Sequence, residues 1–411
     1  MGCCDAPGLM PIDDAIEQML SSVTEIKTTQ QLALENTVGF VLAEDILSPI
    51  NVPPFDNSAM DGYAIKRNDL VATNILQLAG KSFAGQPFEG NWPTGTCIRI
   101  MTGAKIPQGC DAVVMQEDTV VTDNGIEFNN IDIKAGNNIR PIGDDIKRGD
   151  IVLAKGSRLT PRDIPMIASL GISHLTVFDK PKVAFFSTGD ELIPLGEELK
   201  QGQIYDSNRY GLKILLEKFG CEGIDLGIIP DVPEKLRDTF NHAQQIADVV
   251  ITSGGVSVGE ADYTKDILEQ LGSVSFWKIA IKPGKPFAFG RLNDAWFCGL
   301  PGNPVSAALT TYVLVQPMLA KLSAESNWAP PQNIPATTKS AFNKKPGRTD
   351  YQRGVYTVKD GKFEVVSAGN QSSGAFTSMS VANCFVILEH DRGRVDIGDT
   401  VQIQPFNHTQ Y

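Results

Sequence analysis

Carboxylates, hydroxyls and glycines gather after four strand-like runs in the middle of the chain. They lie at residues 187–191 (STGDE), 230–231 (PD), 253–262 (SGGVSVGEAD) and 299–304 (GLPGNP). Glycines let backbone amides approach an anion closely, a helix N-terminus adds partial positive charge, and carboxylates can hold magnesium that bridges phosphate oxygens. A single cluster of this kind is more simply a tight turn. Four clusters at one edge of a sheet would instead predict a site for a phosphate-containing ligand.

A second group of chemical interest is the lysine-rich segment KIAIKPGKP at residues 278–286. If this segment is extended, Lys278 and Lys282 project to the same side, where their mutual repulsion would be relieved by a bound oxyanion. The alternative is a solvated edge strand whose lysines oppose aggregation.

Aspartates also recur in the region before residue 147. They lie in the segments DNSAMDGYA (56–64) and NIRPIGDD (138–145), and TGAKIP (102–107) falls between them. Asx turns would explain single aspartates without any function. From the residues alone, both the structural and the functional interpretation stay open.

The elements that position the first group alternate between strand and helix. Short apolar runs predict strands at 183–186, 224–229, 249–251 and 296–298, and helices are predicted at 210–219, 233–247, 263–271 and 304–322. This alternation predicts a doubly wound, mostly parallel α/β sheet covered on both faces, with its ligands outside the carboxyl ends of the strands. Pro317 is expected to kink the last helix.

The rest of the chain is arranged around this α/β region. An amphipathic helix begins near residue 12, glycine and proline separate short apolar runs between 47 and 146, and Thr160-Pro161 predicts the start of a helix that Gly171 ends. We expect four domains: a discontinuous N-terminal helical domain (1–46 plus 147–180), an inserted β domain (47–146), the α/β domain (181–326) and a C-terminal β domain (327–411).

Composition narrows the class of protein. The chain has 411 residues and a net charge of −12, which argues against a nucleic-acid partner. No apolar run reaches membrane-spanning length, so we expect no membrane association. Seven cysteines without a Cys-x-x-Cys pair and only four histidines make a zinc site or a disulfide framework improbable, and reduced thiols fit the cytoplasm.

Taken together, these segments resemble the molybdopterin molybdenumtransferases, the family of bacterial MoeA and the E domain of gephyrin. The matching words run from residue 56 to 354: DNSAMDGYA, MTGA, CDAVVMQE, NIRPIGDD, FSTGDEL, QIYDSN, SGGVSVGEADYT, KPGKPFAFG, GLPGNPVSA and PGRTDYQRG. The resemblance implies a small C-terminal β barrel and a homodimer whose two active sites each draw on both subunits. It also implies that molybdate and adenylylated molybdopterin are the substrates, that magnesium is required, and that molybdenum cofactor and AMP are the products.

The resemblance also assigns roles to individual residues. Asp61, Thr102 and Glu191 are implied as catalytic, and Glu191, Asp231 and Asp262 as the magnesium ligands. The implied substrate and anion ligands are Arg140, Asp145, Ser253, Gly254, Gly255, Lys278, Lys282, Pro301, Pro304 and Arg353. Expected partners are the upstream molybdopterin adenylyltransferase and the apo-molybdoenzymes that accept the cofactor.

Two other functions compete with this one. The same α/β fold serves the preceding adenylylation of molybdopterin by ATP, although DNSAMDGYA and the flanking regions are typical of the inserting enzyme. A scaffold protein without turnover is the second alternative, since receptor clustering is part of gephyrin's role. Retained carboxylates and lysines favour an active enzyme.

Overall fold

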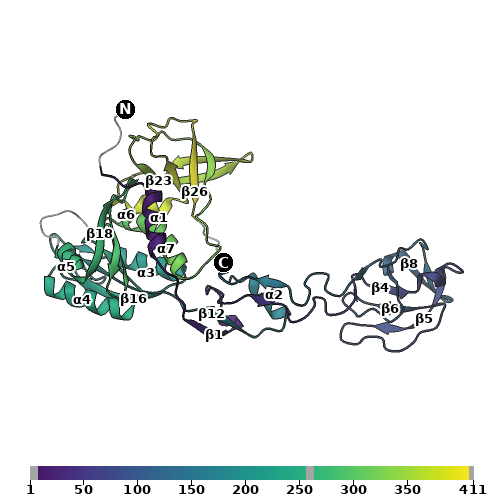
Figure 1. Ribbon diagram of the computed structural model, residues 1–411. Coiled ribbons are helices and arrows are strands. Elements are labelled where there is room, and N and C mark those ends of the chain that lie inside the picture. Colours follow the sequence, from purple (N-terminus) through teal and green to yellow (C-terminus); the bar gives the residue numbers. More distant parts are fainter. Residues whose placement is uncertain (1–7, 256–262, 407–411) are drawn as a thin grey trace.

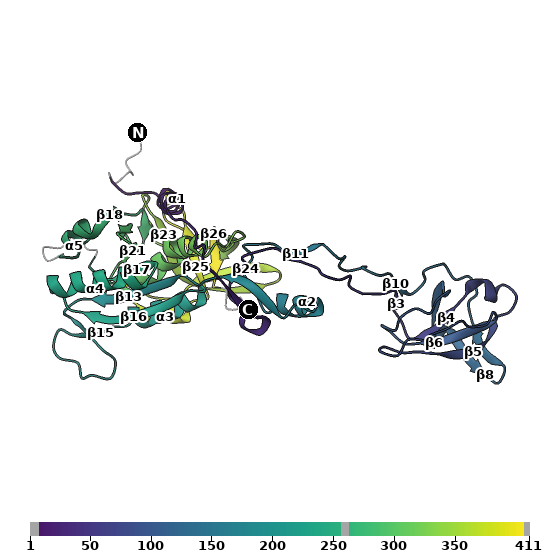
Figure 2. The same ribbon diagram turned by 60° about the horizontal axis from the view of Figure 1, so that its bottom comes forward.

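The computed structural model describes residues 8–255 and 263–406. The chain is long and narrow: one end holds an α/β sheet and a small barrel, and a thin connector leads to a separate β region at the other end (Figures 1 and 2). The fold class predicted from the sequence is confirmed by this architecture.

The α/β sheet has the strand order β16-β13-β17-β21-β20-β18. Its strands are β13 (Lys182–Thr188), β16 (Glu222–Ile229), β17 (Val249–Ser253), β18 (Gly272–Lys278), β20 (Pro286–Leu292) and β21 (Trp296–Leu300). The first four strands in this order are parallel, as predicted, whereas β20 and β18 add an antiparallel hairpin at one edge. The hairpin pairing was not predicted, although an edge strand was the alternative interpretation of the lysine segment, and Lys278 does end the edge strand β18.

Helices cover both faces of this sheet. They are α3 (Asn208–Lys218), α4 (Pro233–Ile246), α5 (Tyr263–Leu271), α6 (Pro304–Thr310) and α7 (Gln316–Leu322), all near their predicted positions. Val183 and Phe185 of β13 pack with α3, α6 and α7, while Ala184 and Phe186 pack with α4 and α5. This alternation follows from the two-residue period of a strand and explains why β13 is apolar throughout. The N-terminal helix α1 (Ile12–Ser22) buries Ala15 and Met19 against the α7 side, in agreement with its predicted apolar face.

The predicted long helix at 304–322 is continuous but irregular. A π-helical turn, Thr311–Val315, separates α6 from α7 and lies just before Pro317. Since proline cannot donate a backbone hydrogen bond and its ring crowds the preceding turn, a locally widened helix accommodates it. The whole helix is long and apolar enough to cross a membrane by length and composition, contrary to the expectation from the sequence, but 72% of the tested window is buried inside the protein. It is therefore a core helix.

The distal β region consists of residues 56–145. Its sheet has the order β7-β4-β6-β5-β9-β8, with β4 (Gly62–Ile65), β5 (Ile75–Ser82), β6 (Thr96–Ile100), β7 (Ala112–Met115), β8 (Thr119–Thr122) and β9 (Gly125–Phe128). Two short antiparallel pairs lead to it: β2 (Ile46–Leu47) with β11 (Ile151–Leu153), and β3 (Asn57–Ser58) with β10 (Ile139–Arg140). The predicted β-rich character of this segment is confirmed, and the connector makes it a body with its own core.

Between the connector and the α/β sheet lies a small layer formed by β1 (Thr29–Ala33), β12 (His174–Phe178) and α2 (Asp163–Ser169). Helix α2 begins later than Thr160-Pro161 predicted. The backbone N–H and the hydroxyl of Thr160 both donate to the Asp163 carboxylate at 2.7 Å, which fixes the first turn. Gly171 follows the helix with φ +77°, as its expected role at the helix end requires.

The C-terminal sheet closes on itself. Strands β23 (Thr349–Lys359), β24 (Lys362–Ser367), β22 (Ile334–Thr338), β26 (Thr400–Pro405) and β25 (Cys384–Leu388) follow in that order, and β25 pairs back with β23. This is the barrel that the resemblance implied. A short strand from the α/β region, β19 (Ile281–Lys282), pairs with β23, and helix α8 (Phe376–Val381) lies beside α6.

A further short pair, β14 (Leu192–Ile193) with β15 (Ile204–Tyr205), follows β13.

Candidate functional site

The carboxyl ends of β13 and β16 bring two aspartates together. The Thr188 hydroxyl donates to Asp231 Oδ1, and the backbone N–H of Asp231 donates to Asp190 Oδ1 at 3.2 Å. Glu191 is exposed in the same turn, and its carboxylate lies over Gly189, where an added Cβ would be 2.5 Å from Glu191 Oε2. Parallel strands end at one edge, so the carboxylates gather there as the sequence predicted.

The glycine loops after β17 and β21 lie against each other at the same edge. Gly254 has φ +99°, and a Cβ there would meet the carbonyl oxygen of Thr188 at 2.6 Å, so only glycine fits. Its N–H donates to Leu300 O at 3.1 Å, and a Cβ on Gly302 would lie 4.0 Å from the Gly254 Cα. The backbones of the two loops are thus in direct contact at this edge.

Asn208, at the start of α3, ties the two loops together. Its side-chain Nδ2 donates to Ser253 Oγ at 2.8 Å and to Gly302 O at 2.7 Å. Behind it, Ser187 donates to the buried Asp206 carboxylate, which also forms an ion pair with Arg209 at 2.8 Å. These hydrogen bonds fix the helix start relative to three strand ends. Pro301 is buried in the second loop, and Pro304 occupies the first turn of α6.

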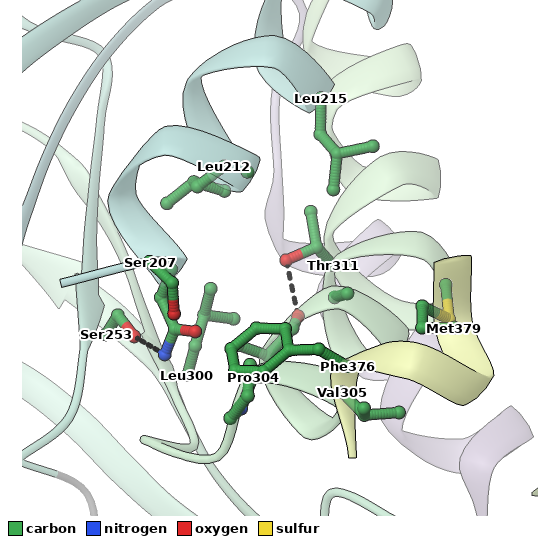
Figure 3. A pocket seen from close by; sticks show the side chains of 14 residues that line it. Ser207, Leu212, Leu215, Ser253, Leu300, Pro304, Val305, Thr311, Phe376 and Met379 are labelled. Atoms are coloured by element: carbon green, nitrogen blue, oxygen red, sulfur yellow. Dashed lines mark hydrogen bonds between the residues drawn. The ribbon is translucent and has the colours of Figure 1, made fainter. Parts of the chain in front are cut away.

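A cavity of about 150 Å³ lies beside these loops, between α3, α6 and α8. Figure 3 shows the labelled side chains Leu212, Leu215, Leu300 and Phe376 directed toward a common space. Hydroxyls of Ser207, Ser253 and Thr311 lie at its margin (Figure 3). The cavity is mostly apolar and was not predicted from the sequence.

The lysine segment is not one extended strand. Lys278 ends β18 and is exposed, whereas Lys282 lies on β19, in the sheet of the barrel. The spacing argument for a common face therefore does not apply, because the strand stops between them. Lys282 Nζ forms an ion pair at 2.9 Å with Asp350, whose side chain is 3% exposed. This contact fixes the Lys282 amine at the junction of the α/β sheet and the barrel.

Arg353 is buried inside the barrel domain and holds a loop. Its guanidinium donates to Asn370 O at 3.0 Å, to Ser372 O at 2.8 Å and to Ser378 Oγ at 3.2 Å. The next carbonyl, Ser373 O, accepts from the backbone N–H of Val305 at 3.1 Å, in the first turn of α6. Arg353 therefore positions the loop that packs against the glycine-proline turn, and burial lowers the pKa of its guanidinium.

Asp61 and Thr102 form a pair in the distal β region. Asp61 Oδ1 accepts from the Thr102 backbone N–H and from the Thr102 hydroxyl, each at 2.7 Å. The backbone bond, then the hydroxyl bond, hold the pKa of Asp61 below its usual value, and Arg99 nearby acts in the same direction against slight desolvation. Asp61 is therefore an ionised, rigidly held carboxylate. Arg140, on β10, and Asp145, after it, are exposed on the connector.

The expected site residues thus fall into two groups in one chain. Asp61 and Thr102 belong to the distal β region, and Arg140 and Asp145 lie where the connector joins it. The strand ends and the lysines belong to the opposite end of the molecule (Figures 1 and 2). Asp262 lies outside the described residues. A single chain does not bring the two groups together.

Comparisons with known proteins cover nearly the whole chain. The MoeA N-terminal region (domain I and II) matches residues 10–171, a probable molybdopterin binding domain matches 184–321, and the MoeA C-terminal region (domain IV) matches 335–406. The molybdopterin molybdenumtransferase of Haemophilus influenzae is 52% identical over 97% of this chain and 99% of its own length. The chain belongs to the molybdopterin molybdenumtransferase family. It is accordingly a transferase of molybdenum cofactor biosynthesis.

Other members of the family are also similar to this chain over nearly its whole length. The enzyme of Bacillus subtilis is 32% identical over 96% of this chain and 93% of its own length, and gephyrin of Dictyostelium discoideum is 33% identical over 97% of this chain. The chain spans 63% of that gephyrin. The solved MoeA protein of Pyrococcus horikoshii OT3 superposes with a TM-score of 0.83 at 31% identity, over 97% of this chain and all of that chain.

The residues at the strand ends fit magnesium only in part. Asp190, Glu191 and Asp231 supply the hard oxygen ligands that magnesium prefers. No group of three or more His, Cys, Asp or Glu side chains that could enclose a metal is found in residues 8–255 and 263–406.

Sequence reasoning missed several residues that the structure brings into the site. Asp190, Asn208 and Asp350 contact expected site residues directly, and Phe376 comes from the barrel domain to the cavity. Asn208 and Asp350 stand inside the words QIYDSN and PGRTDYQRG, so the resemblance marked their segments but not their contacts. No local pattern marks Phe376.

The hydrogen bonds from Thr102 give a first prediction. Thr102→Val keeps the backbone bond to Asp61 but removes the hydroxyl bond, so the pKa of Asp61 should rise toward its ordinary value. The pKa of Asp61 is lower in the folded protein than in the unfolded chain, so ionised Asp61 stabilises the fold at pH values above the unfolded-state pKa. This stabilisation is lost as the pH falls through the folded-state pKa. In the variant, whose folded-state pKa is higher, it should be lost at a higher pH. Carboxyl NMR titration measures the shift. Thr96→Val, at the start of β6, should leave the Asp61 titration unchanged, and an unchanged titration in Thr102→Val would refute the assignment.

Proposed function

We propose that the enzyme transfers molybdenum from molybdate to adenylylated molybdopterin, releasing AMP and forming molybdenum cofactor, with magnesium required. The observation that carries the proposal is the convergence of carboxylates, glycine loops and a helix start at one sheet edge. Such an edge suits a ligand with phosphates that must be held and then separated. We place this reaction in the cytoplasm and expect no nucleic acid or membrane partner.

The reaction has two parts. An oxygen of water or molybdate forms a bond to a phosphorus of the phosphoanhydride, the bridging P–O bond breaks, and AMP leaves. The two dithiol sulfurs bind molybdenum and release their protons, and a displaced oxide takes up two protons and leaves as water. Ser253 and Gly255 bind phosphate oxygens, whereas the Gly254 N–H, bonded to Leu300 O, holds their loop in place. Pro301 and Pro304 shape the loop opposite. Glu191 and Asp231, with Asp262 outside the described residues, would hold magnesium, which neutralises charge that develops on the phosphates.

Basic side chains form the molybdate site, either by binding the oxyanion or by holding the loop beside it. Lys278 and Lys282 bind molybdate, and Asp350 keeps the Lys282 amine in place without removing its exposure. Arg353 acts here by fixing the Ser372 loop over the first turn of α6. Burial in the barrel and three hydrogen bonds commit its guanidinium to that role.

A second subunit completes the site. Asp61, Thr102, Arg140 and Asp145 lie at the far end of the same chain, so we propose a homodimer in which these residues reach the strand ends of the partner. The connector that carries them exposes the apolar side chains of Leu47, Phe55 and Ile142. We propose that the chain has the four domains expected from the sequence: 1–46 with 147–180, 47–146, 181–326 and 327–411. The upstream adenylyltransferase and acceptor apo-molybdoenzymes are the proposed partners.

Glu191→Gln tests the chemistry. Gln keeps the size and hydrogen bonding of Glu191 but removes the charge that a hard cation needs, so AMP release from adenylyl-molybdopterin with molybdate and magnesium should fall by at least about a hundredfold. Because Glu191 is exposed, the melting temperature should stay near that of the wild type. If activity stays within about twofold while melting falls, Glu191 acts only through the local turn, and the metal ligands must be sought at Asp231 and Asp262.

The lysines give a separate prediction about anion binding. A charged hydrogen bond to an anion contributes roughly 1.5–3 kcal/mol, so Lys278→Ala and Lys282→Ala should each weaken molybdate binding about ten- to a hundredfold. Lys285→Ala is the matched control, because its residue follows the Pro-Gly turn and we assign it no anion. Titration calorimetry with molybdate measures all three. Unchanged binding in the Lys278, Lys282 double variant contradicts the role of these lysines.

A further inference from the structure

Arg158 lies at the root of the connector. We call residues 46–153, which comprise the connector and the distal β region with Asp61, the arm. Arg158 follows β11, the strand that returns from the distal region, and forms an antiparallel bridge with Val41, on the segment that leads out to β2. The connector is the thin link between the two ends of the molecule (Figures 1 and 2). The direction of the arm is therefore set where these two segments meet the α/β domain.

The guanidinium of Arg158 joins segments that are remote in sequence. Its Nη1 donates to Gly39 O at 2.7 Å, on the outgoing segment. Its Nε and Nη2 both donate to Glu325 Oε2, at 2.9 and 2.7 Å, just beyond the end of α7. The side chains of Arg158 and Glu325 are only 21% and 12% exposed, so water screens this charge-assisted contact little. One side chain thus ties both connector segments to the core helix of the α/β domain.

Gly220 makes room for this guanidinium. It follows α3 with φ +79°, and an added Cβ would overlap Arg158 Nη1 and lie 3.1 Å from Gly39 O. A side chain at this position would therefore push the guanidinium away from its partners. Because Gly220 precedes the start of β16, the contact lies at the opposite edge of the sheet from the strand-end carboxylates.

Other contacts at the root do not depend on Arg158. The Ser326 N–H donates to Gly156 O at 3.0 Å. A small buried apolar cluster packs beside this bond and consists of Val41, Phe178 and Ala324. Since these contacts remain when Arg158 is shortened, the root should stay folded and gain angular freedom rather than come apart.

The length of the connector makes that angle important. About nine residues separate the end of β2 from the start of β3, and an extended chain of that length spans up to about 30 Å. A rotation of about two degrees at the root then moves the far end of the connector by about 1 Å. A misplacement of about 1 Å can lower a catalytic rate about a hundredfold. A small change at Arg158 therefore becomes a large one at Asp61.

We propose that Arg158 is a positioning residue for the reaction: by holding Gly39 O and Glu325 together, it fixes the angle of the arm and places Asp61 in the site of the partner subunit. The inference rests on the proposed two-chain site, because it is there that the arm's angle affects the chemistry. Arg158 itself touches none of the proposed substrate ligands, and the resemblance implied no role for it.

Mixed dimers show from which chain Arg158 acts. When a Glu191→Ala chain pairs with an Asp61→Ala chain, the one intact site takes its arm from the first chain and its strand ends from the second. Arg158→Ala is added to one chain or the other, and each mixed dimer is isolated through two different affinity tags. The kcat and KM of AMP release from adenylyl-molybdopterin are then compared with those of the parent mixed dimer.

The effect should depend on the chain that carries the change. Arg158→Ala in the arm-donating chain should lower kcat about tenfold or more and leave KM within about twofold, because the substrate binds at the strand ends of the other chain. Arg158→Ala in the chain that donates the strand ends should leave both constants within about twofold. A general loss of stability would not distinguish the two chains.

Three further variants sharpen the test. Gly220→Ala displaces the guanidinium without removing it and should act from the same chain as Arg158→Ala. Glu325→Gln removes the charge of the ion pair and keeps the size of the side chain, so it carries the test if Arg158→Ala lowers the yield of folded dimer. Lys321→Ala is the matched control, since Lys321 Nζ donates to Leu20 O at 2.6 Å between α7 and α1, and kcat should stay within about twofold.

Equal losses of kcat from both chains, an unchanged kcat when the arm-donating chain is altered, or a rise of KM alone would overturn the positioning role. The two-chain site fails separately, if the parent mixed dimer releases no AMP, and the role of Arg158 then fails with it. If the parent mixed dimer is active and Arg158→Ala acts equally from either chain, the two-chain site stands and the role of Arg158 alone is wrong.

Discussion

The close approach of the loops after β17 and β21 is the constraint on which the site depends. A side chain at Gly254 would collide with the carbonyl oxygen of Thr188, so the loop can follow this path only with glycine. The Gly254 N–H bond to Leu300 O and the two bonds from Asn208 then fix the loops, the start of α3 and the strand ends as one unit. Backbone amides, carboxylates and the apolar cavity all take their positions from this unit.

The second constraint is the length of the molecule. The connector places the Asp61–Thr102 pair far from the strand ends of its own chain (Figure 2). Asp61 is held as an ionised carboxylate by two hydrogen bonds of 2.7 Å from Thr102. We propose that another chain supplies the other half of this site.

Much of the fold could be predicted from the sequence because the local signals agree with the tertiary structure. Apolar strands such as Val183–Phe186 bury both faces, and Pro233 marks the start of its helix. The pairing of β18 with β20 was not predicted, although an edge strand was one interpretation of the lysine segment. Helix α2 begins at Asp163, whose carboxylate accepts from Thr160 while its N–H donates to Thr160 O. At these places the structure depends on which side chains pair, and the spacing of residues in the sequence does not reveal those pairs.

The same distinction applies to the site. Glycine and carboxylate clusters at strand ends could be predicted, because parallel strands end at one edge. The Lys282–Asp350 ion pair and the contribution of Phe376 could not, since both join the α/β sheet to a barrel that folds from a segment remote in sequence. The barrel thus contributes to the candidate site through contacts that only the folded chain reveals.

The central claim is that one active site is built from two chains, and subunit mixing tests it most directly. Asp61→Ala and Glu191→Ala proteins, each inactive alone, are mixed, allowed to exchange subunits and assayed for AMP release. If Asp61 of one chain serves the strand ends of the other, a mixed dimer contains one intact site, so activity should return to about a quarter of the wild-type level at equal mixing. A chain that stays monomeric by light scattering, or a mixture as inactive as its components despite exchange, would contradict the account.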